Sequence, residues 1–324
     1  MKTALLVNSE NFEKYANWSS AGFELIHIGT QEPDPEKIIA TGAGALLVDP
    51  MLKVGAEIIL NMPELRIIHS FGVAYNGIDL EAARDVGVYV CNNAGVNAYP
   101  VAEQALLLIL SLLKKYRWGE DMVYAGRQME AKSACFENGL PELGGLSVGL
   151  VGLGAISKAL ASMLTPFGCK LSYFTRSGDH GLTGLAYIPL DELYSSCDII
   201  SLGVPVTPET TNMINSETLK LFKRGAILIN TARGDLMDLE AVIGALKSGQ
   251  LGGLGADTLA PGPLSPDDPL LRELASNELQ RRVALSPHIG GITAGCFIRA
   301  YERSRQNIEA VANGQRPNCI VNGL

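Results

Sequence analysis

The chain alternates short runs of consecutive apolar residues with longer stretches in which apolar residues recur at helical spacing. Runs that are apolar throughout are typical of strands buried on both faces of a parallel sheet, and the helical stretches supply the crossovers between them. Runs that are wholly or mostly apolar occupy 3–7, 24–28, 45–48, 65–70, 88–91, 146–151, 170–174, 198–202, 226–230, 254–257 and 283–286. The pattern therefore predicts an α/β fold.

A glycine-rich turn follows the run at 146–151. It reads Gly152-Leu153-Gly154-Ala155-Ile156-Ser157 and leads into a helical stretch at 155–164, which is the setting of a dinucleotide-binding fingerprint. Gly152 allows the tight turn, and Gly154 lets the backbone approach a pyrophosphate at the N-terminus of the helix that Ala155 and Ile156 begin. Ser157 replaces the usual third glycine or alanine. The turn predicts a bound dinucleotide, and an ordinary glycine turn in another α/β protein is the alternative.

The next strand, 170–174, ends without the acidic residue that NAD-binding proteins place there for the adenosine ribose. Thr175, Arg176 and Ser177 follow it instead. Two hydroxyls and a guanidinium suit a 2′-phosphate, because arginine binds phosphate through bidentate, charge-assisted hydrogen bonds. We expect NADP(H) as the preferred cofactor, with NAD(H) possible. In the alternative, Arg176 is a solvated loop residue and Asp179 binds the ribose.

The glycine turn lies in the middle of the chain, after a complete small α/β unit and a long apolar helix predicted at 101–117. The segment 293–312 is again helical and leads to a strand-like tail at 318–322. The simplest arrangement has two Rossmann-like or flavodoxin-like domains. In it, a dinucleotide-binding domain at 98–292 is inserted into a substrate domain formed by 1–97 and 293–324.

The length, charge and cysteine spacing of the chain exclude several kinds of partner. A length of 324 residues is enough for two domains, and a net charge of −8 argues against nucleic acid or an anionic membrane as a partner. The six cysteines are scattered, without a metal-binding spacing. The start of the chain lacks the pattern of a signal peptide, and the most apolar stretch, 105–113, is too short to span a bilayer. We therefore expect a reduced, cytoplasmic protein without a metal.

Five further motifs stand in a fixed order between 65 and 293. They are residues 71–79 (FGVAYNGID), 101–103 (VAE), 201–210 (SLGVPVTPET), 229–234 (INTARG) and 285–291 (LSPHIGG). In this order they resemble the D-isomer-specific 2-hydroxyacid dehydrogenases, a family that includes glyoxylate, hydroxypyruvate and phosphoglycerate dehydrogenases and formate dehydrogenase. Ala74 and Asn76 stand where the family usually has glycine and aspartate. The resemblance implies reduction of a small 2-oxo acid to the D-2-hydroxy acid.

The resemblance assigns the catalytic roles to Arg233 and His288. Both lie just beyond the ends of predicted parallel strands, the edge at which open α/β sheets bind ligands. Arg233 offers a fork of donors for the substrate carboxylate, and His288 can give a proton to the 2-oxo group as hydride arrives. The backbone N–H groups of Val73 and Ala74 complete the expected substrate contacts.

The cofactor contacts follow from the fingerprint and from the same resemblance. Asp257 is expected to hydrogen-bond the nicotinamide carboxamide, and Pro205 and Thr210 to lie near the nicotinamide ribose. The full expected set is Gly152, Gly154, Ala155, Ile156, Thr175, Arg176, Ser177, Pro205, Thr210, Thr231, Ala232, Asp257 and Gly290.

One catalytic position departs from the family. The glutamate that pairs with the histidine and keeps it protonated is replaced by Gly262. Three interpretations remain open. An Arg–His pair still reduces 2-oxo acids, with Asp267 or Asp268 reaching back, and we favour this one. Alternatively, the enzyme acts on an unusual small anion, or the chain is an NADP(H)-sensing binding protein.

The remaining histidines, His27, His69 and His180, lack such a setting and are interpreted as structural, and Trp18 and Trp118 as packing or interface residues. The absence of bulky charge around Met51 favours a small, uncharged substituent, as in glyoxylate, hydroxypyruvate or pyruvate. Because the helix at 101–117 is more hydrophobic than a surface helix permits, we expect a homodimer formed through it.

Overall fold

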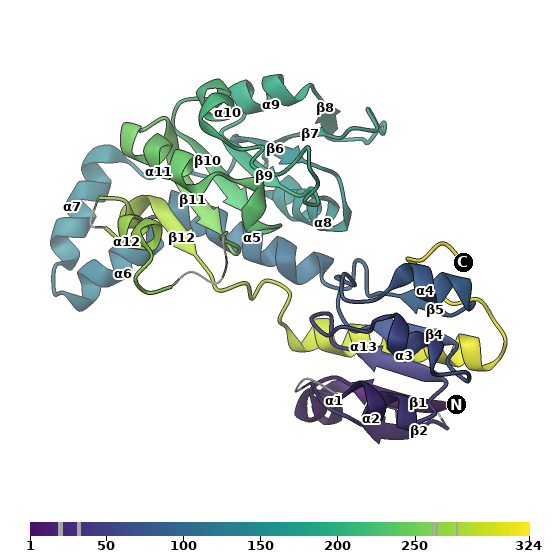
Figure 1. Ribbon diagram of the computed structural model, residues 1–324. Coiled ribbons are helices and arrows are strands. Elements are labelled where there is room, and N and C mark those ends of the chain that lie inside the picture. The colour runs from purple at the N-terminus through teal and green to yellow at the C-terminus, as the bar shows by residue number, and fades with distance from the viewer. Residues whose placement is uncertain (19–21, 31–33, 261, 263–264, 277) are drawn as a thin grey trace. The chain divides into compact units, whose positions relative to one another are not determined.

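The computed structural model describes residues 1–18, 22–30, 34–260, 262, 265–276 and 278–324. The chain divides into two compact units, one formed by Met1–Val96 with Ile292–Leu324 and the other by Asn97–Gly291 (Figure 1). Each of these boundaries lies one residue before the position that the sequence suggested. Both units contain a parallel sheet flanked by helices, which confirms the α/β class.

The first unit has five strands in the order β2-β1-β3-β4-β5. The helices α2, α3 and α4 cover one face of this sheet, and α1 and α13 cover the other. Every residue of β3 and β4 is buried, as the unbroken apolar run of β3 predicted, and β4 buries the polar residues His69 and Ser70 as well. The strands are β1 (Lys2–Leu6), β2 (Glu24–His27), β3 (Ala45–Val48), β4 (Ile67–Ser70) and β5 (Tyr89–Cys91), and the helices are α1 (Ser9–Tyr15), α2 (Pro35–Ala40), α3 (Ala56–Leu60), α4 (Leu80–Asp85) and α13 (Ala294–Ala312).

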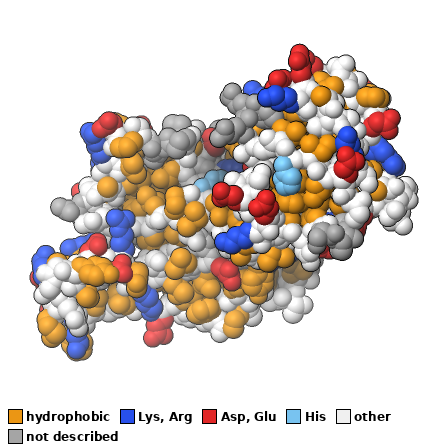
Figure 2. Space-filling model, turned by 90° about the horizontal axis from the view of Figure 1, so that it is seen from below, with side chains coloured by type: hydrophobic (Ala, Val, Ile, Leu, Met, Phe, Trp, Pro, Cys, Tyr) orange, Lys and Arg blue, Asp and Glu red, His pale blue; other side chains and the backbone are white. Residues whose placement is uncertain are grey.

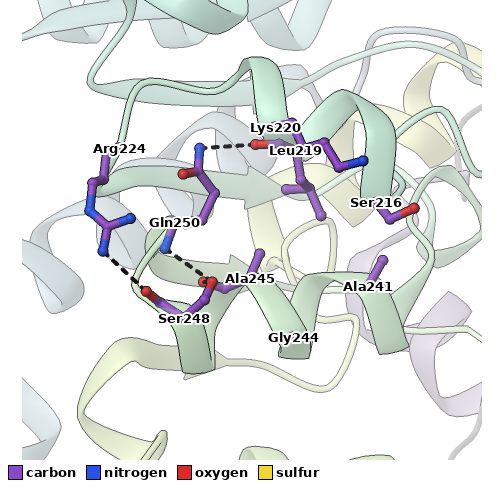
Figure 3. A pocket seen from close by; sticks show the side chains of 9 residues that line it. All are labelled: Ser216, Leu219, Lys220, Arg224, Ala241, Gly244, Ala245, Ser248 and Gln250. Atoms are coloured by element: carbon purple, nitrogen blue, oxygen red, sulfur yellow. Dashed lines mark hydrogen bonds between the residues drawn. The ribbon is translucent and has the colours of Figure 1, made fainter.

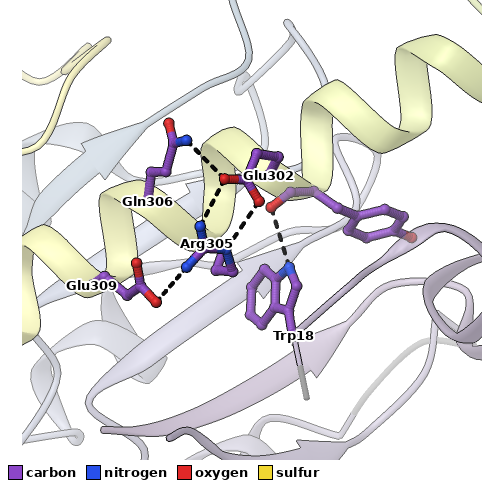
Figure 4. Close-up of polar contacts among 6 residues, drawn as sticks. Trp18, Glu302, Arg305, Gln306 and Glu309 are labelled. Atoms are coloured by element: carbon purple, nitrogen blue, oxygen red, sulfur yellow. Dashed lines mark hydrogen bonds and ion pairs between the residues drawn. The ribbon is translucent and has the colours of Figure 1, made fainter. Parts of the chain in front are cut away.

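Helix α13 brings the C-terminal segment back to the first unit. The indole Nε1 of Trp18 donates to the carbonyl oxygen of Tyr301 at 3.2 Å (Figure 4). On the flank of the same helix, Arg305 pairs with Glu302 and Glu309, one turn before and after it (Figure 4). Trp18 is 3% exposed, so it is a packing residue of this unit.

A buried histidine joins β4 to α13. The Nε2 atom of His69 lies 3.0 Å from the side-chain nitrogen of Asn307, whose amide is oriented by two hydrogen bonds to the backbone of Asn318. Nε2 therefore accepts, and Nδ1 carries the proton that it shares with the Ser70 carbonyl at 2.9 Å. Burial lowers the pKa of His69 to about 4. His69 is thus a neutral, structural residue.

The predicted C-terminal strand is not formed. Ile320 makes an isolated antiparallel bridge to Cys91. Beyond it, the side-chain amide of Asn322 takes the place of a strand backbone, accepting from Val90 N–H at 3.2 Å and donating to the Val88 carbonyl at 2.8 Å. The Asn322 side chain thus makes the hydrogen bonds to Val88 and Val90 that the backbone of a further strand residue would otherwise make.

The second unit has seven parallel strands in the order β12-β11-β10-β9-β6-β7-β8. Helices α5 and α8 pack on one face, and α9, α10 and α11 on the other (Figure 1). The strand β8 was not predicted, because none of its residues is fully buried and its pattern is therefore not apolar throughout. The strands are β6 (Ser147–Val151), β7 (Lys170–Phe174), β8 (Leu185–Tyr187), β9 (Ile199–Leu202), β10 (Ala226–Asn230), β11 (Leu251–Ala256) and β12 (Val283–Leu285).

The helices of this unit include three short 3-10 turns. They are α5 (Ala98–Leu113), α6 (Tyr116–Tyr124), α7 (Gln128–Asn138), α8 (Ala155–Leu164), η1 (Thr165–Phe167), α9 (Leu190–Ser196), α10 (Ser216–Leu221), η2 (Gly234–Leu236), α11 (Leu239–Ser248), α12 (Pro269–Leu274) and η3 (Gln280–Arg282).

The predicted helix at 101–117 is in fact two helices. Helix α5 ends at Leu113, Lys115 adopts a left-handed backbone with φ of 50°, and α6 begins at Tyr116. Helix α5 packs inside its own unit, where Leu108 lies over Gly255, so closely that a Cβ on that glycine would be 3.0 Å from the Leu108 Cβ. Intramolecular burial therefore accounts for much of the hydrophobicity of α5, but Tyr99 and Leu107 on this helix stay exposed, and an interface through it stays a prediction.

No helix among the described residues is long and apolar enough to cross a membrane. Within the same part of the chain, no group of three or more histidine, cysteine, aspartate or glutamate side chains is arranged to hold a metal ion. On the face drawn in Figure 2, apolar side chains are exposed among charged ones.

Candidate active site

The glycine turn after β6 lies at the point where the strand order of the second sheet reverses, between β6 and β9. Open α/β sheets bind ligands at this point. Gly152 has φ of 92°, and a Cβ there would lie 2.5 Å from the Gly203 carbonyl oxygen. A Cβ on Gly203 would in turn lie 2.4 Å from the Ser157 Oγ. The serine in the third fingerprint position is therefore accommodated because residue 203 has no side chain.

The start of α8 fits the pyrophosphate of a dinucleotide. Gly154 is the N-cap of α8 and offers no side chain to the free N–H groups of the first turn, which Ala155 and Ile156 begin. A Cβ on Gly154 would have no atom within 4 Å among the described residues. Uncapped donors facing open space form an anion site, so this end of α8 is suited to hold a phosphate group.

The loop after β7 carries the predicted adenosine-ribose contacts. Arg176 is exposed, and Thr175 and Ser177 place their hydroxyl oxygens 3.1 Å apart. The Oδ1 atom of Asp179 accepts from the Tyr173 hydroxyl at 2.7 Å and from the Gly181 N–H at 2.9 Å. The Gly181 N–H and the Tyr173 hydroxyl lower the pKa of Asp179. One oxygen of this carboxylate, Oδ1, is thus engaged within its own loop.

The loop after β9 is closed on itself. The Thr210 hydroxyl donates to the Pro205 carbonyl at 2.7 Å and accepts from the Thr207 N–H at 2.7 Å. Thr210 therefore shapes the segment that begins at Pro205. Whether Pro205 and Thr210 contact a cofactor remains a sequence-based expectation.

The turn after β10 positions Arg233 through a buried asparagine. Asn230 is fully buried, and its side chain accepts from Ala232 N–H at 3.0 Å and donates to the Arg233 carbonyl at 2.7 Å. The Arg233 side chain is exposed, with Nη1 on the Ala232 carbonyl at 2.8 Å. Gly234 then passes the next loop so closely that a Cβ would lie 2.3 Å from the Ala260 nitrogen. The loops after β10 and β11 are therefore fixed against each other.

His288 stands on a strained turn held by Asp257. Its φ is 58°, a left-handed conformation that is uncommon outside glycine. Asp257 is 3% exposed, and its carboxylate accepts from the N–H groups of Ile289 at 3.0 Å and Gly290 at 2.8 Å. Three hydrogen bonds to this carboxylate, counting one from the Ser286 hydroxyl, outweigh the cost of the turn.

The number of hydrogen bonds that the Asp257 carboxylate accepts also limits its expected contact with the cofactor. A carboxylate has about four acceptor sites, and here Oδ1 receives Ser286 and Ile289 while Oδ2 receives Gly290. One site on Oδ2 is left for a carboxamide. The sequence did not indicate the anchoring role of Asp257, nor that Gln104 donates to Ser286 at 2.8 Å. The sequence feature that could have indicated this network is Ser286, the polar residue directly before Pro287 and His288.

Gly262, at the position of the missing glutamate, is exposed. A Cβ on Gly262 would lie 2.9 Å from the Leu259 carbonyl oxygen. The two carboxylates considered as substitutes are engaged elsewhere: Asp268 caps α12, accepting from Leu270 N–H at 2.9 Å, and Asp267 pairs with Arg272. Among the described residues, no ion pair involves His288. The suggestion that Asp267 or Asp268 reaches back is therefore wrong.

The predicted substrate loop belongs to the first unit and is held by its carbonyl groups. The Asn92 side chain donates to the Val73 carbonyl at 2.7 Å, the Ser70 hydroxyl to the Ala74 carbonyl at 2.6 Å, and the Asn93 N–H to the Gly72 carbonyl at 2.9 Å. Within the described part of the chain, the N–H groups of Val73 and Ala74 donate to no backbone carbonyl. The loop thus keeps two adjacent donors available for an anion.

The expected residues therefore fall into two groups. Arg233, His288 and all the expected cofactor contacts lie in the second unit, in loops at the C-terminal ends of its parallel strands or at the start of α8. Val73 and Ala74 lie in the first unit, beyond the end of β4. The sequence did not indicate the supporting residues Asn92 and Ser70. Asn92 follows an apolar run and Ser70 ends one, so both resemble ordinary strand ends.

A separate groove of about 610 Å³ lies between α10 and α11 (Figure 3). None of the expected site residues lines it. Two of its polar side chains are bound to the backbone: Arg224 donates to the Ser248 carbonyl at 3.2 Å, and Gln250 to the Leu219 carbonyl at 3.0 Å (Figure 3). We therefore do not assign the chemistry to this groove.

Comparison with known proteins gives a consistent result. The family model described as "D-isomer specific 2-hydroxyacid dehydrogenase, NAD binding domain" matches residues 106–290. The chain is 32% identical to a glyoxylate reductase of Korarchaeum cryptofilum, covering 99% of this chain and 96% of that protein. A glyoxylate reductase of Thermofilum pendens is 35% identical, covering 83% of this chain and 78% of that protein.

Solved structures agree with this result over the whole length. D-2-hydroxyisocaproate dehydrogenase has a TM-score of 0.86 at 27% identity, covering 100% of both chains. D-lactate dehydrogenase with NAD+ from Lactobacillus jensenii has a TM-score of 0.87 at 26% identity, covering 99% of both.

Proposed function

The chain belongs to the D-isomer-specific 2-hydroxyacid dehydrogenases, and from that premise we propose that it reduces a small 2-oxo acid of the glyoxylate or hydroxypyruvate type with NADPH. Membership of the family makes it an oxidoreductase that acts on 2-hydroxy acids with a nicotinamide dinucleotide. The identity of the oxo acid, the phosphate on the cofactor and the roles of single residues are the proposed part.

In the proposed reaction, the bound dihydronicotinamide supplies a hydride to C2 of the oxo acid. His288 donates its proton to the carbonyl oxygen, so the product is the hydroxy acid and His288 is left neutral until solvent reprotonates it. Arg233 binds the carboxylate through its fork of donors and stays charged throughout. The N–H groups of Val73 and Ala74 offer two further donors to the carboxylate.

The observation that carries this proposal is the backbone at His288. A left-handed histidine held by a buried carboxylate is a costly arrangement, and its effect is to fix one imidazole at the edge of the sheet. Cofactor binding alone does not require this, so the turn favours an enzyme over an NADP(H)-sensing binding protein. Without a carboxylate partner, His288 would work as the only acid of an Arg–His pair.

Two features support NADP(H) over NAD(H). Arg176 is exposed and stands in the chain between Thr175 and Ser177, whose hydroxyl oxygens lie 3.1 Å apart. The carboxylate that could have bound an unphosphorylated ribose, Asp179, has its Oδ1 atom engaged by Tyr173 and Gly181. A phosphate binds to such a set of donors through charge-assisted hydrogen bonds, whereas a ribose diol needs an acceptor.

We also propose that the chain forms a homodimer, through α6 and α7. Large apolar side chains are exposed on both helices, namely Tyr116, Val123 and Tyr124 on α6 and Met129 and Phe136 on α7. A groove of about 580 Å³ lies between these helices. A second copy of the chain would cover this surface, as the isologous contacts of symmetric dimers do.

The test is the absorbance decay of NADPH, and in parallel NADH, with glyoxylate, hydroxypyruvate, pyruvate and phenylpyruvate. We expect decay with NADPH and the small oxo acids, and a loss of at least about 100-fold in kcat/KM in an Arg233→Gln variant. Binding of NADPH without turnover of any oxo acid would contradict the proposed reaction.

A further inference from the structure

The loop between β7 and β8 contains a histidine that the sequence analysis interpreted as structural. The Nε2 atom of His180 lies 2.9 Å from the Ser177 Oγ and 3.3 Å from the Thr175 Oγ1. These are two of the three residues that the NADP(H) proposal assigns to the 2′-phosphate. The imidazole therefore lies on the same hydroxyl groups as the expected ligand.

The available hydrogens limit what this group can donate. The Thr175 hydroxyl gives its one hydrogen to the Gly178 carbonyl at 2.9 Å, so its oxygen can only accept from its neighbours. The Ser177 hydroxyl, 3.1 Å away, has one hydrogen of its own. With a neutral imidazole that accepts at Nε2, these three atoms share a single hydrogen. A protonated His180 adds a second donor and a positive charge.

The position of the imidazole is set by its backbone. The His180 N–H donates to the Tyr173 hydroxyl at 2.7 Å, and the same hydroxyl donates to Asp179 Oδ1 at 2.7 Å. The ring of His180 lies beside that of Tyr173, with centroids 6.2 Å apart. Because Tyr173 is a buried residue of β7, this end of the loop is tied to the sheet.

The charged and titratable groups around the loop are few. Asp179 is next in the chain and interacts electrostatically with His180. Tyr187 of β8 packs on Tyr173 from the other side. From the loop after β9, Glu209 has its pKa lowered chiefly by the Thr207 hydroxyl and further by the charge of Arg176.

We propose that His180 is a proton-linked ligand of the cofactor's 2′-phosphate, so that the phosphate recruits one proton onto the imidazole and is bound by Arg176, Ser177 and His180 together. This inference rests on the proposed NADP(H) preference and extends it to a residue outside the fingerprint. On binding, the dianionic 2′-phosphate and one proton from solvent enter the site. The proton converts the His180 ring to an imidazolium, whose Nε2–H faces the phosphate oxygens. The hydroxyl of Ser177 is then free to donate as well.

The experiment measures binding of 2′,5′-ADP and of 5′-AMP by titration calorimetry at pH 7.5, in two buffers of different ionisation enthalpy. The native chain, His180→Gln and His27→Gln are compared, since His27 is an exposed histidine of the other unit. We expect the native chain and His27→Gln to take up a fraction of a proton with 2′,5′-ADP. His180→Gln should take up none and bind it about fivefold to tenfold more weakly, because a charge-assisted bond becomes a neutral one.

Two results would overturn the inference and are distinguishable. If 2′,5′-ADP binds more tightly than 5′-AMP but proton uptake is the same in His180→Gln, the phosphate is recognised without His180. If the native chain binds both nucleotides equally and Arg176→Ala changes neither, the NADP(H) preference itself is wrong. Unchanged binding of 5′-AMP in His180→Gln establishes that this variant keeps its fold.

Discussion

Asp257 accepts a hydrogen bond from the backbone N–H of Gly290 at 2.8 Å, and this bond closes the turn on which His288 stands. The two residues come from the ends of neighbouring strands, β11 and β12, which are paired in parallel. A carboxylate at the end of one strand therefore fixes the backbone conformation at the end of the next. The proton donor of the proposed reaction is thus positioned through its main chain.

This arrangement predicts the effect of Asp257→Asn. An amide presents an N–H₂ group where two oxygens now accept, so at least one of the N–H groups of Ile289 and Gly290 would lose its partner. We expect kcat to fall by about 100-fold, since a displacement of about 1 Å in a catalytic group has an effect of that size. The unfolding free energy should fall by about 1–3 kcal/mol, because a buried donor is left unpaired.

Steady-state kinetics and denaturant unfolding measure the two effects. Asp267→Asn is the matched control, since Asp267 is an exposed residue paired with Arg272 in the same part of the chain. A native kcat in Asp257→Asn would show that the turn at His288 does not depend on the carboxylate.

Gly203 and Ser157 form a second interdependent pair. A Cβ on Gly203 would lie 2.4 Å from the Ser157 Oγ, so Gly203→Ala should destabilise the second unit by about 1–3 kcal/mol and weaken dinucleotide binding. The double variant Gly203→Ala with Ser157→Gly removes the clash and should recover most of both losses. Thermal unfolding and a fluorescence titration with NADPH give the interaction energy as a double-mutant cycle. Additive losses would mean that the two positions are not coupled.

Much of the fold was predictable because parallel strands buried on both faces leave an unbroken apolar run, as in β3. The edge strand β8 lacks that burial and was missed. The break between α5 and α6 falls at Lys115, where neither glycine nor proline marks it. The support of His288 joins Asp257 to residues about thirty positions away, and no local pattern records such a contact.

The substrate loop of the first unit leads to a third prediction, for Asn92→Asp. The Asn92 amide donates to the Val73 carbonyl at 2.7 Å, and a carboxylate in its place would face that carbonyl with no hydrogen to give. The loop carrying the N–H groups of Val73 and Ala74 would then lose its position. We expect KM for the oxo acid to rise about tenfold, from the loss of roughly one hydrogen bond to a charged group, and KM for NADPH to stay unchanged.

Kinetics with each substrate varied in turn separates these constants. Asn138→Asp provides a control, since Asn138 is exposed and its side chain bonds only within its own helix, to the Ala134 carbonyl. An equal rise in both KM values for Asn92→Asp would indicate general disorder instead of a loss of substrate binding.

The buried His69 predicts how stability depends on pH. Burial lowers its folded pKa to about 4 from the ordinary 6.5, so between these values the unfolded chain binds a proton that the folded chain does not. The stability of the first unit therefore falls as the pH is lowered from 6.5 towards 4, by up to about 3 kcal/mol from this residue alone. Above pH 6.5 both states are neutral and His69 adds no pH dependence.

Denaturant unfolding of the native chain, His69→Gln and His27→Gln at pH 7 and pH 5 tests this expectation. His69→Gln should be less stable at pH 7, because it disturbs hydrogen bonds to Ser70 and Asn307, but its stability should fall less between the two pH values. His27→Gln removes an exposed histidine and should keep the native pH dependence. If the native chain and His69→Gln lose the same free energy between pH 7 and pH 5, then groups other than His69 govern the acid sensitivity.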